Sequence, residues 1–251
     1  MGFVPASDIH DVIARLDALV EGYRSGASRL GYFPALYRRV TLAVRDGIAQ
    51  GRFQDGPRMD RLDTAFANRY LEAIAAWQEG RACSACWRKA FEAADRWRPT
   101  ILQHLLAGMA AHIQFDLGIA AATVAPGPAL AGLESDFMAI NEVLNGLTGP
   151  VQAALDGLSP WMGILDLAGG SLDEALARFG MGAARDGAWA FAERLAPLPQ
   201  DQWSPHLAEA DAAVAELAGL ITGPGPVLST LCLIVRIPET GDPRRVIETL
   251  A

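Results

Sequence analysis

A histidine and an aspartate stand four residues apart in the otherwise apolar stretch Gly108-Met-Ala-Ala-His-Ile-Gln-Phe-Asp-Leu117. Residues at positions i and i+4 of a helix lie on one face, so His112 and Asp116 are expected to meet. The residues around them are apolar on nearly every side, which is typical of a buried helix. Burial costs roughly 1–3 kcal/mol for each polar group left unpaired. This pair is therefore the first candidate for chemistry.

Three interpretations of the pair are open at this stage. An aspartate that orients the imidazole would leave the second ring nitrogen free to move a proton. The same spacing is similar to that in helical zinc phospholipases, where both side chains bind metal. Those sites need further histidines, and this chain has only His10, His104 and His206 besides. The third interpretation is a buried hydrogen bond that fixes helix packing. We expect no cofactor, with a divalent metal on His112 and Asp116 as the less favoured alternative.

The elements that must position this pair are predicted to be helices. Alanine and leucine are abundant, which favours helix. Apolar residues at helical spacing predict helices over about 7–21, 34–50, 57–78, 82–96, 100–124, 130–158, 171–195 and 206–220. Residues 22–31 are expected to form a loop, and residues 227–237 either a helix or a strand.

Apart from the undecided residues 227–237, no segment shows the pattern of a strand, so the expected fold class is all-α. We expect a single-domain multi-helix bundle of about nine to ten helices around a central buried helix (about 100–124). The domain is expected to span 1–251, with 1–30 as an N-terminal helix and loop. Residues 224–251 are interpreted as a C-terminal appendage of uncertain type.

The composition excludes several kinds of partner. The chain has 21 basic and 29 acidic residues, a net charge of −8, which argues against a nucleic-acid partner. No window reaches the ~18 uninterrupted apolar residues of a membrane span. Asp8, Asp11 and Asp17 interrupt any N-terminal targeting segment. The pair Cys83 and Cys86 lacks a second pair and is interpreted as core. A cytoplasmic location is expected, and the oligomeric state is left open.

Five blocks of sequence carry a resemblance to a known family. They are YRRVTLAV (37–44), RLDTAFANRY (61–70), LAGMAAHIQFDL (106–117), DFMAINEVL (136–144) and ARDGAWAFAERL (184–195). In this order they resemble a bacterial family, domain of unknown function 5995, over about residues 30 to 195. The resemblance implies a mostly helical fold and brings no established activity.

The central block departs from the pattern that the resemblance implies, which reads close to Gly-Met-Asn-Ala-His-Ile-Asn-x-Asp-Leu. Here Ala110 and Gln114 stand at the two asparagine positions, and Phe115 at a position that is often basic. The histidine and aspartate remain while their neighbours become smaller or more apolar. This combination suits a pocket for an apolar ligand.

Other polar residues of the matching blocks are predicted to bind substrate in the same cavity: Asp63, Asn68, Tyr70, Asp136 and Asn141. Gly108, one turn before His112, removes a side chain from the same face and is expected to leave room for a ligand. Arg185 and Asp186 are interpreted as a solvated or capping pair, with an arginine that reaches into the pocket as the alternative.

The leading hypothesis is a small-molecule enzyme of specialised metabolism. It would use His112 and Asp116 for acid/base chemistry (cyclisation, isomerisation or hydrolysis) on a small apolar substrate. One alternative is a non-catalytic helical binding protein for a hydrophobic metabolite. A second alternative is a metal-dependent hydrolase resembling helical zinc phospholipases. The chain contains neither a phosphate-binding glycine loop with its lysine nor a Gly-x-Ser-x-Gly nucleophile elbow.

Overall fold

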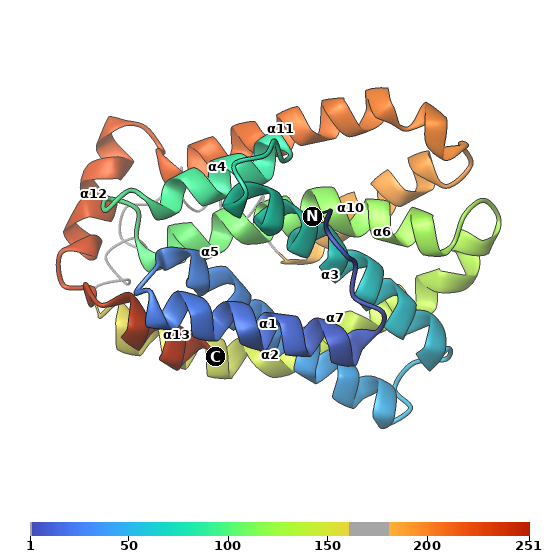
Figure 1. The fold of residues 1–251 in the computed structure, drawn as a ribbon, viewed down its shortest axis with the longest axis horizontal. Coiled ribbons are helices and arrows are strands. Elements are labelled where there is room, and N and C mark those ends of the chain that lie inside the picture. The colour runs from blue at the N-terminus through green and yellow to red at the C-terminus, as the bar shows by residue number, and fades with distance from the viewer. Residues whose placement is uncertain (1, 161–180) are drawn as a thin grey trace.

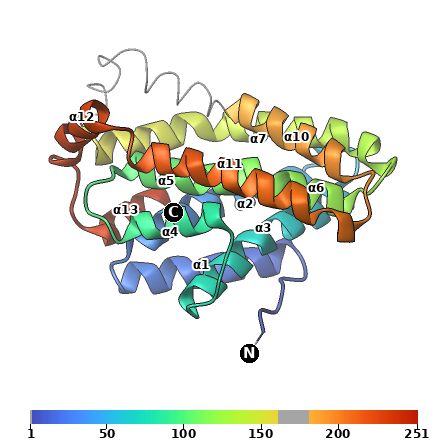
Figure 2. The ribbon, with the colours of Figure 1, turned by 90° about the horizontal axis from the view of Figure 1, so that it is seen from above.

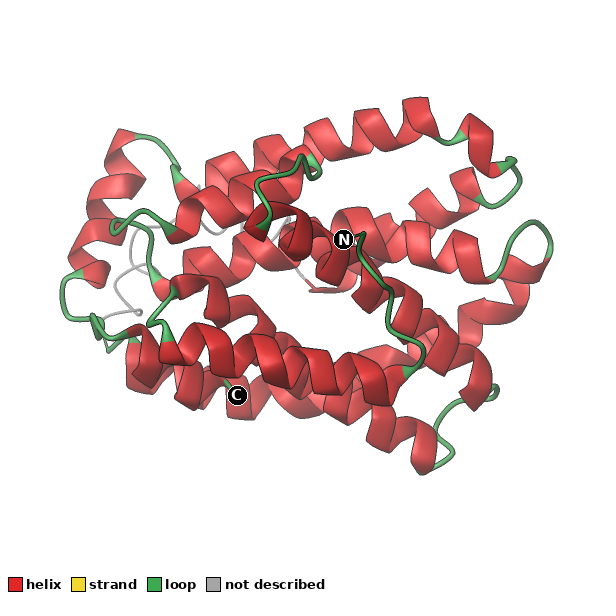
Figure 3. Cartoon of the chain, in the orientation of Figure 1, coloured by secondary structure: helices red, strands yellow, loops and turns green. Residues whose placement is uncertain are grey.

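The structure is a computed structural model that describes residues 2–160 and 181–251. In these residues every regular element is a helix (Figure 3), which confirms the all-α class. The described α-helices are α1 (Ile9–Ser25), α2 (Tyr32–Ala49), α3 (Gly56–Gln78), α4 (Ala85–Ala94), α5 (Ile101–Met109), α6 (Leu117–Val124), α7 (Ala129–Leu158), α10 (Met181–Leu195), α11 (Ser204–Thr222), α12 (Pro226–Arg236) and α13 (Pro243–Leu250). The first part of the helix predicted over 171–195 lies outside the described residues.

Three shorter helical elements complete the described chain. Two are 3₁₀-helices, η1 (Arg29–Gly31) and η3 (Gln200–Gln202), and the third is a π-helix, η2 (Ala110–Asp116), between α5 and α6. The run from α5 through η2 to α6 contacts α2 and α3 on one side and α4, α10 and α11 on the other (Figure 1). Helices α7 and α1 lie on opposite sides of this run (Figure 2).

Among the described helices, the run from α5 to α6 is strongly apolar. It begins at a capping box, in which the Thr100 hydroxyl accepts from the Gln103 backbone N–H and the Gln103 side chain accepts from the Thr100 N–H. By length and composition Ile101–Val124 could cross a membrane, and α11 with α12 passes the same test as a bent pair. However, 78% of the most apolar window of Ile101–Val124 is buried inside the protein. Burial in the core therefore accounts for its composition.

The segment predicted to be a C-terminal appendage forms two helices, of which α13 belongs to the core. Val246, Ile247 and Leu250 are fully buried and pack with α2 residues in a second hydrophobic cluster. The α13 helix also requires a glycine opposite it, because a Cβ on Gly31 would lie 2.5 Å from the Ile247 Cδ1. The residues 227–237, whose type the sequence left open, are helical.

Asp136 ties α7 to the turn between α2 and α3. Its carboxylate accepts hydrogen bonds from the backbone N–H groups of Gln54 (2.6 Å) and Asp55 (3.0 Å) and from the Arg58 guanidinium (3.1 Å). Asp136 is 1% exposed and does not line the cavity that has His112 in its wall. That Asp136 binds substrate stays a prediction, and in the structure its acceptor capacity serves this turn.

We expect Asp136→Ala to lower the free energy of unfolding by about 2–4 kcal/mol, because it leaves the half-buried Arg58 guanidinium and two backbone N–H groups without their acceptor. Asp46→Ala is the control. Asp46 is exposed and, among the described residues, is paired only with its neighbour Arg45, so its loss should cost less than about 1 kcal/mol. Urea denaturation followed by circular dichroism measures both. Equal losses in the two variants would contradict the role given to Asp136.

Candidate functional site

His112 and Asp116 lie on the π-helix η2 rather than on the α-helix that the sequence predicts. The wider turn is seen in the backbone, where the Leu117 N–H donates to the His112 carbonyl five residues earlier. Such insertions are rare and often occur at functional sites. The two side chains still meet, with 3.3 Å between the His112 Nδ1 and the Asp116 Oδ2.

Asp116 is a junction between three helical elements. Its Oδ1 accepts from the Arg69 Nε of α3 at 3.2 Å, and its Oδ2 accepts from the Trp87 Nε1 of α4 at 2.8 Å as well as from His112. The carboxylate is 1% exposed. Since a carboxylate only accepts, this arrangement assigns the imidazole proton to Nδ1 and leaves Nε2 as an acceptor.

Aromatic rings enclose the His112 imidazole. The Phe66 ring stacks on it with centroids 3.5 Å apart and planes 8° apart, and the Tyr37 ring meets it edge-on at 4.5 Å. His112 is 2% exposed. Burial lowers the pKa of His112 below its ordinary value, and the hydrogen bond to Asp116 offsets only part of this effect. The imidazole is therefore neutral at neutral pH.

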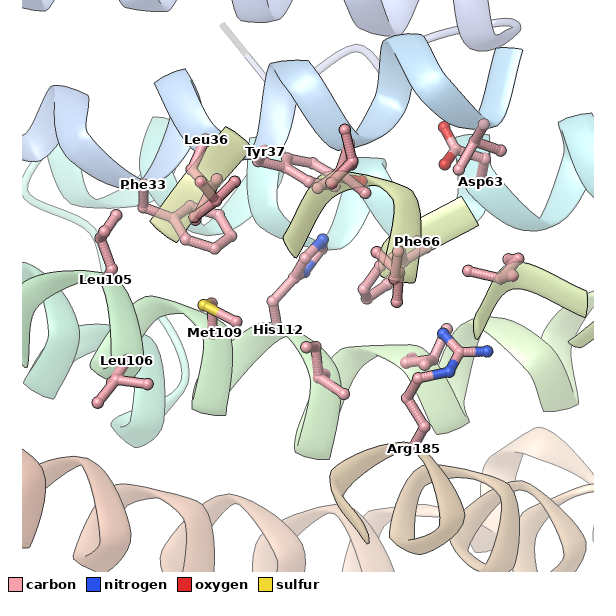
Figure 4. A pocket seen from close by; sticks show the side chains of 18 of the residues that line it. Phe33, Leu36, Tyr37, Asp63, Phe66, Leu105, Leu106, Met109, His112 and Arg185 are labelled. Atoms are coloured by element: carbon pink, nitrogen blue, oxygen red, sulfur yellow. The ribbon is translucent and has the colours of Figure 1, made fainter. Parts of the chain in front are cut away.

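A cavity of about 270 Å³ lies against His112. Its wall is formed mainly by aliphatic and aromatic side chains of α2, α3, α5, η2 and α7. Figure 4 shows His112 between Tyr37 and Phe66, with Leu105 and Leu106 towards one end and Arg185 towards the other. The described polar residues of the wall are Tyr37, Asp63, His112, Gln152 and Arg185. Asp116 does not line this cavity, so it is a positioning residue for His112.

Unpartnered polar atoms concentrate in this wall. Among the described residues, seven buried side-chain nitrogen or oxygen atoms have no hydrogen-bond partner. Four of the seven belong to cavity residues, namely the Tyr37 hydroxyl, the Asp63 Oδ2, the His112 Nε2 and the Arg185 Nε. Because buried polar groups are nearly always paired, such a cluster calls for an explanation.

Asp63 is the acidic group of the wall. Its side chain extends from α3 and is 7% exposed. Burial, with a smaller contribution from the negative charge of Asp60, raises the pKa of Asp63 to about 8. The carboxyl group is therefore mostly protonated at neutral pH and can donate a hydrogen bond.

Arg185 turns into the cavity and not towards solvent with Asp186. It is 4% exposed, donates to the Phe137 backbone carbonyl and lies over the Phe137 ring, 4.6 Å from its centroid. No salt bridge joins it to an acidic side chain of the described residues, although the nearby charge of Asp186 acts to raise its pKa. The interpretation as a solvated or capping pair is wrong, because successive residues of α10 face different directions and Asp186 is exposed.

Gly108 does not leave room for a ligand. A Cβ at this position would lie 2.6 Å from the Phe33 Cδ2, so the space is filled by the Phe33 ring. Tyr70 lies beside the same ring, with centroids 5.0 Å apart, and lines only a small hollow of about 20 Å³. Both residues pack against the Phe33 ring and lie outside the wall of the cavity beside His112. Their positions therefore do not match the substrate contacts predicted from the sequence.

Asn68 and Asn141 also lie outside the wall of the cavity. Asn68 fixes the N-terminal segment by accepting from the Ala6 N–H at 2.7 Å and donating to the Ala6 carbonyl at 3.0 Å. Asn141 is half-buried and its amide approaches the Met138 sulfur at 3.9 Å. Of the substrate-binding residues predicted from the sequence, Asp63 is thus the one that lines the cavity. Tyr37 and Phe66 were missed, although both fall within the blocks that carried the resemblance.

The residues present do not fit a metal ion well. No group of three or more His, Cys, Asp or Glu side chains that could hold a metal ion occurs in residues 2–160 and 181–251. In addition, both Asp116 oxygens already accept from donors, one of them the cationic Arg69. A metal centre of the phospholipase type would need ligands beyond this pair.

The comparisons with known proteins give a family and no activity. A family described as "Family of unknown function (DUF5995)" matches residues 9–224, so the chain belongs to this family. No curated protein and no solved structure matches the chain. The matched residues contain the whole described wall of the cavity.

The Asp63 carboxyl makes stability depend on pH in a definite direction. Its pKa is about 8 in the folded protein against an ordinary value of 3.8, so the unfolded state binds fewer protons between these two pH values. The stability that the protonated group contributes is therefore present below about pH 4 and is lost as the pH rises towards about 8. Asp63→Asn should remove this loss, making the variant more stable than the wild type by about 3–5 kcal/mol near pH 9. Urea denaturation of both proteins at several pH values measures the difference, and parallel pH profiles would contradict the assignment.

Proposed function

We propose that this DUF5995 protein is a small-molecule enzyme in which His112 removes a proton from a mostly apolar substrate held in the cavity. The observation that carries the proposal is the His112 imidazole itself. Its Nδ1 is hydrogen-bonded to Asp116, whereas its Nε2 is buried in the wall of a cavity without a hydrogen-bond partner. A neutral imidazole with a free lone pair is what a general base requires.

Asp116 would act through His112. It holds the ring in the tautomer with the proton on Nδ1, and it would stabilise the imidazolium that forms when Nε2 accepts a proton. Arg69 and Trp87 hold the carboxylate in turn. The geometry is therefore suited to repeated proton transfer at one atom, with the ring fixed by the stacked Phe66.

Asp63 would supply the complementary acid. Because its pKa is about 8, it carries a proton at neutral pH and can give that proton to the substrate. A base and an acid on one apolar wall support isomerisation or cyclisation, in which a proton leaves one atom and another is added elsewhere. As part of this proposal, the enzyme acts in specialised metabolism and is located in the cytoplasm.

A second candidate is a non-catalytic binding protein for a hydrophobic molecule. It is favoured by the predominance of aliphatic and aromatic side chains in the wall, which is typical of ligand pockets in general. In this case the unpartnered polar atoms would orient the bound molecule through hydrogen bonds without chemistry. The two candidates differ in whether His112 changes its protonation state during a cycle.

The probe 5-nitrobenzisoxazole separates them, since it is small and apolar and its ring opens on removal of one proton. We expect the wild type to accelerate the opening and His112→Gln to lower the rate by about 100-fold or more. Asp116→Asn should also lower the rate, because the ring loses its orienting acceptor. The absorbance of the opened product measures the rate.

His104→Gln is the matched control. His104 is also buried and its Nε2 is also unpartnered, but it lies outside the cavity wall. Its substitution should leave the rate unchanged. If the probe binds with the same affinity to the wild type and to His112→Gln and neither protein accelerates its opening, the binding protein is the better account.

A further inference from the structure

The cavity has one charged end. Arg185 reaches into it from α10 on the side away from Leu105 and Leu106 (Figure 4). Its guanidinium is held by the Phe137 carbonyl and the Phe137 ring, and its Nε has no partner. The carboxylate of Asp186 attracts the guanidinium, but its effect on the Arg185 pKa is smaller than that of burial, and no described acidic side chain forms a salt bridge with it. A buried cation of this kind is costly, and in proteins such groups are paired or bind a ligand.

The other titratable groups of the described wall do not balance this charge. Asp63 has a pKa of about 8 and is mostly uncharged at neutral pH, while burial lowers the pKa of His112 and keeps it neutral. Burial also lowers the pKa of Arg185, to about 10, which still leaves the guanidinium charged at neutral pH. The described wall therefore carries one net positive charge.

The opposite end of the cavity is mainly apolar, and Gln152 is the polar residue that α7 adds to the described wall. It is bounded by Leu102, Leu105 and Leu106 of α5 and by Val151 and Leu155 of α7. The complement of this wall is a molecule with a singly charged anionic head and an apolar body. A carboxylate matches the single charge and can accept from the unpartnered Nε, whereas a phosphate would bring close to two charges.

We propose that the ligand of this cavity is an amphiphilic carboxylate, whose head group pairs with Arg185 and whose apolar chain lies between α5 and α7. The inference rests on the proposed function in that the cavity is taken to be the ligand site, and it adds the chemical class of the substrate.

Calorimetric titration with decanoate, decanol and decyltrimethylammonium tests the head group while the chain is held constant. We expect the wild type to bind decanoate about 10-fold or more tightly than decanol, and decyltrimethylammonium least. Arg185→Met should lower decanoate binding to the level of decanol, and Arg185→Lys should retain part of the preference because it keeps the charge.

Arg194→Met is the matched control, because Arg194 also lies on α10 over an aromatic ring, that of Phe191, but is exposed and paired with Glu209. It should bind all three probes as the wild type does. Thermal melts without ligand give a second readout. If Arg185 serves the ligand, Arg185→Met removes an unbalanced buried charge and should be at least as stable as the wild type.

Each result bears on the inference. Equal affinity of the wild type for decanoate and decanol would overturn the carboxylate while leaving the cavity as a ligand site. If Arg185→Met is less stable than the wild type and still prefers decanoate to decanol, Arg185 has a structural role only. That result would also overturn the inference. Failure of all three probes to bind would overturn this inference, whereas proton removal from 5-nitrobenzisoxazole would still stand as a separate test of the proposed function.

Discussion

The structure around the candidate site depends on one buried carboxylate. Asp116 is almost fully buried, and it is satisfied only because α3, α4 and η2 each send a donor to it. Breaking a buried pair of this kind leaves an uncompensated charge and typically costs about 3–5 kcal/mol. The interaction therefore fixes the mutual placement of three elements and, through the bond to Nδ1, the orientation of the His112 ring.

The same arrangement places a cavity beside His112, and several polar atoms in its wall lack hydrogen-bond partners. The π-helical turn places His112 against the stacked Phe66 and the edge of Tyr37, and the cavity lies beside these rings. Elsewhere in the described chain most buried polar side chains have partners, while four of the seven exceptions face this single space. Departures from regular packing and from hydrogen-bond satisfaction are expected mainly at functional sites. The concentration of unpartnered polar atoms in this wall is therefore the physical basis for placing the candidate site here.

The sequence predicted the helices well because their apolar periodicity and their proline and glycine boundaries are local signals. It also predicted that His112 and Asp116 meet, since the spacing brings them to one face. It could not predict the π-turn, for which no residue type is diagnostic. The role of Gly108 could not be predicted, because only the fold shows that Phe33 fills the space beside it. The direction of the Arg185 side chain could not be predicted either, because it depends on how α10 packs on Phe137.

The most direct test of the account is the protonation state of His112, read by long-range ¹H–¹⁵N correlation spectroscopy of protein labelled at its histidines, with His112→Gln to assign the signal. We expect a neutral ring at pH 7 with the proton on Nδ1 and a bare Nε2, and a change of this signal in Asp116→Asn. A doubly protonated imidazolium at pH 7, or a ring with its proton on Nε2, would contradict the central claim that His112 presents a free base to the cavity.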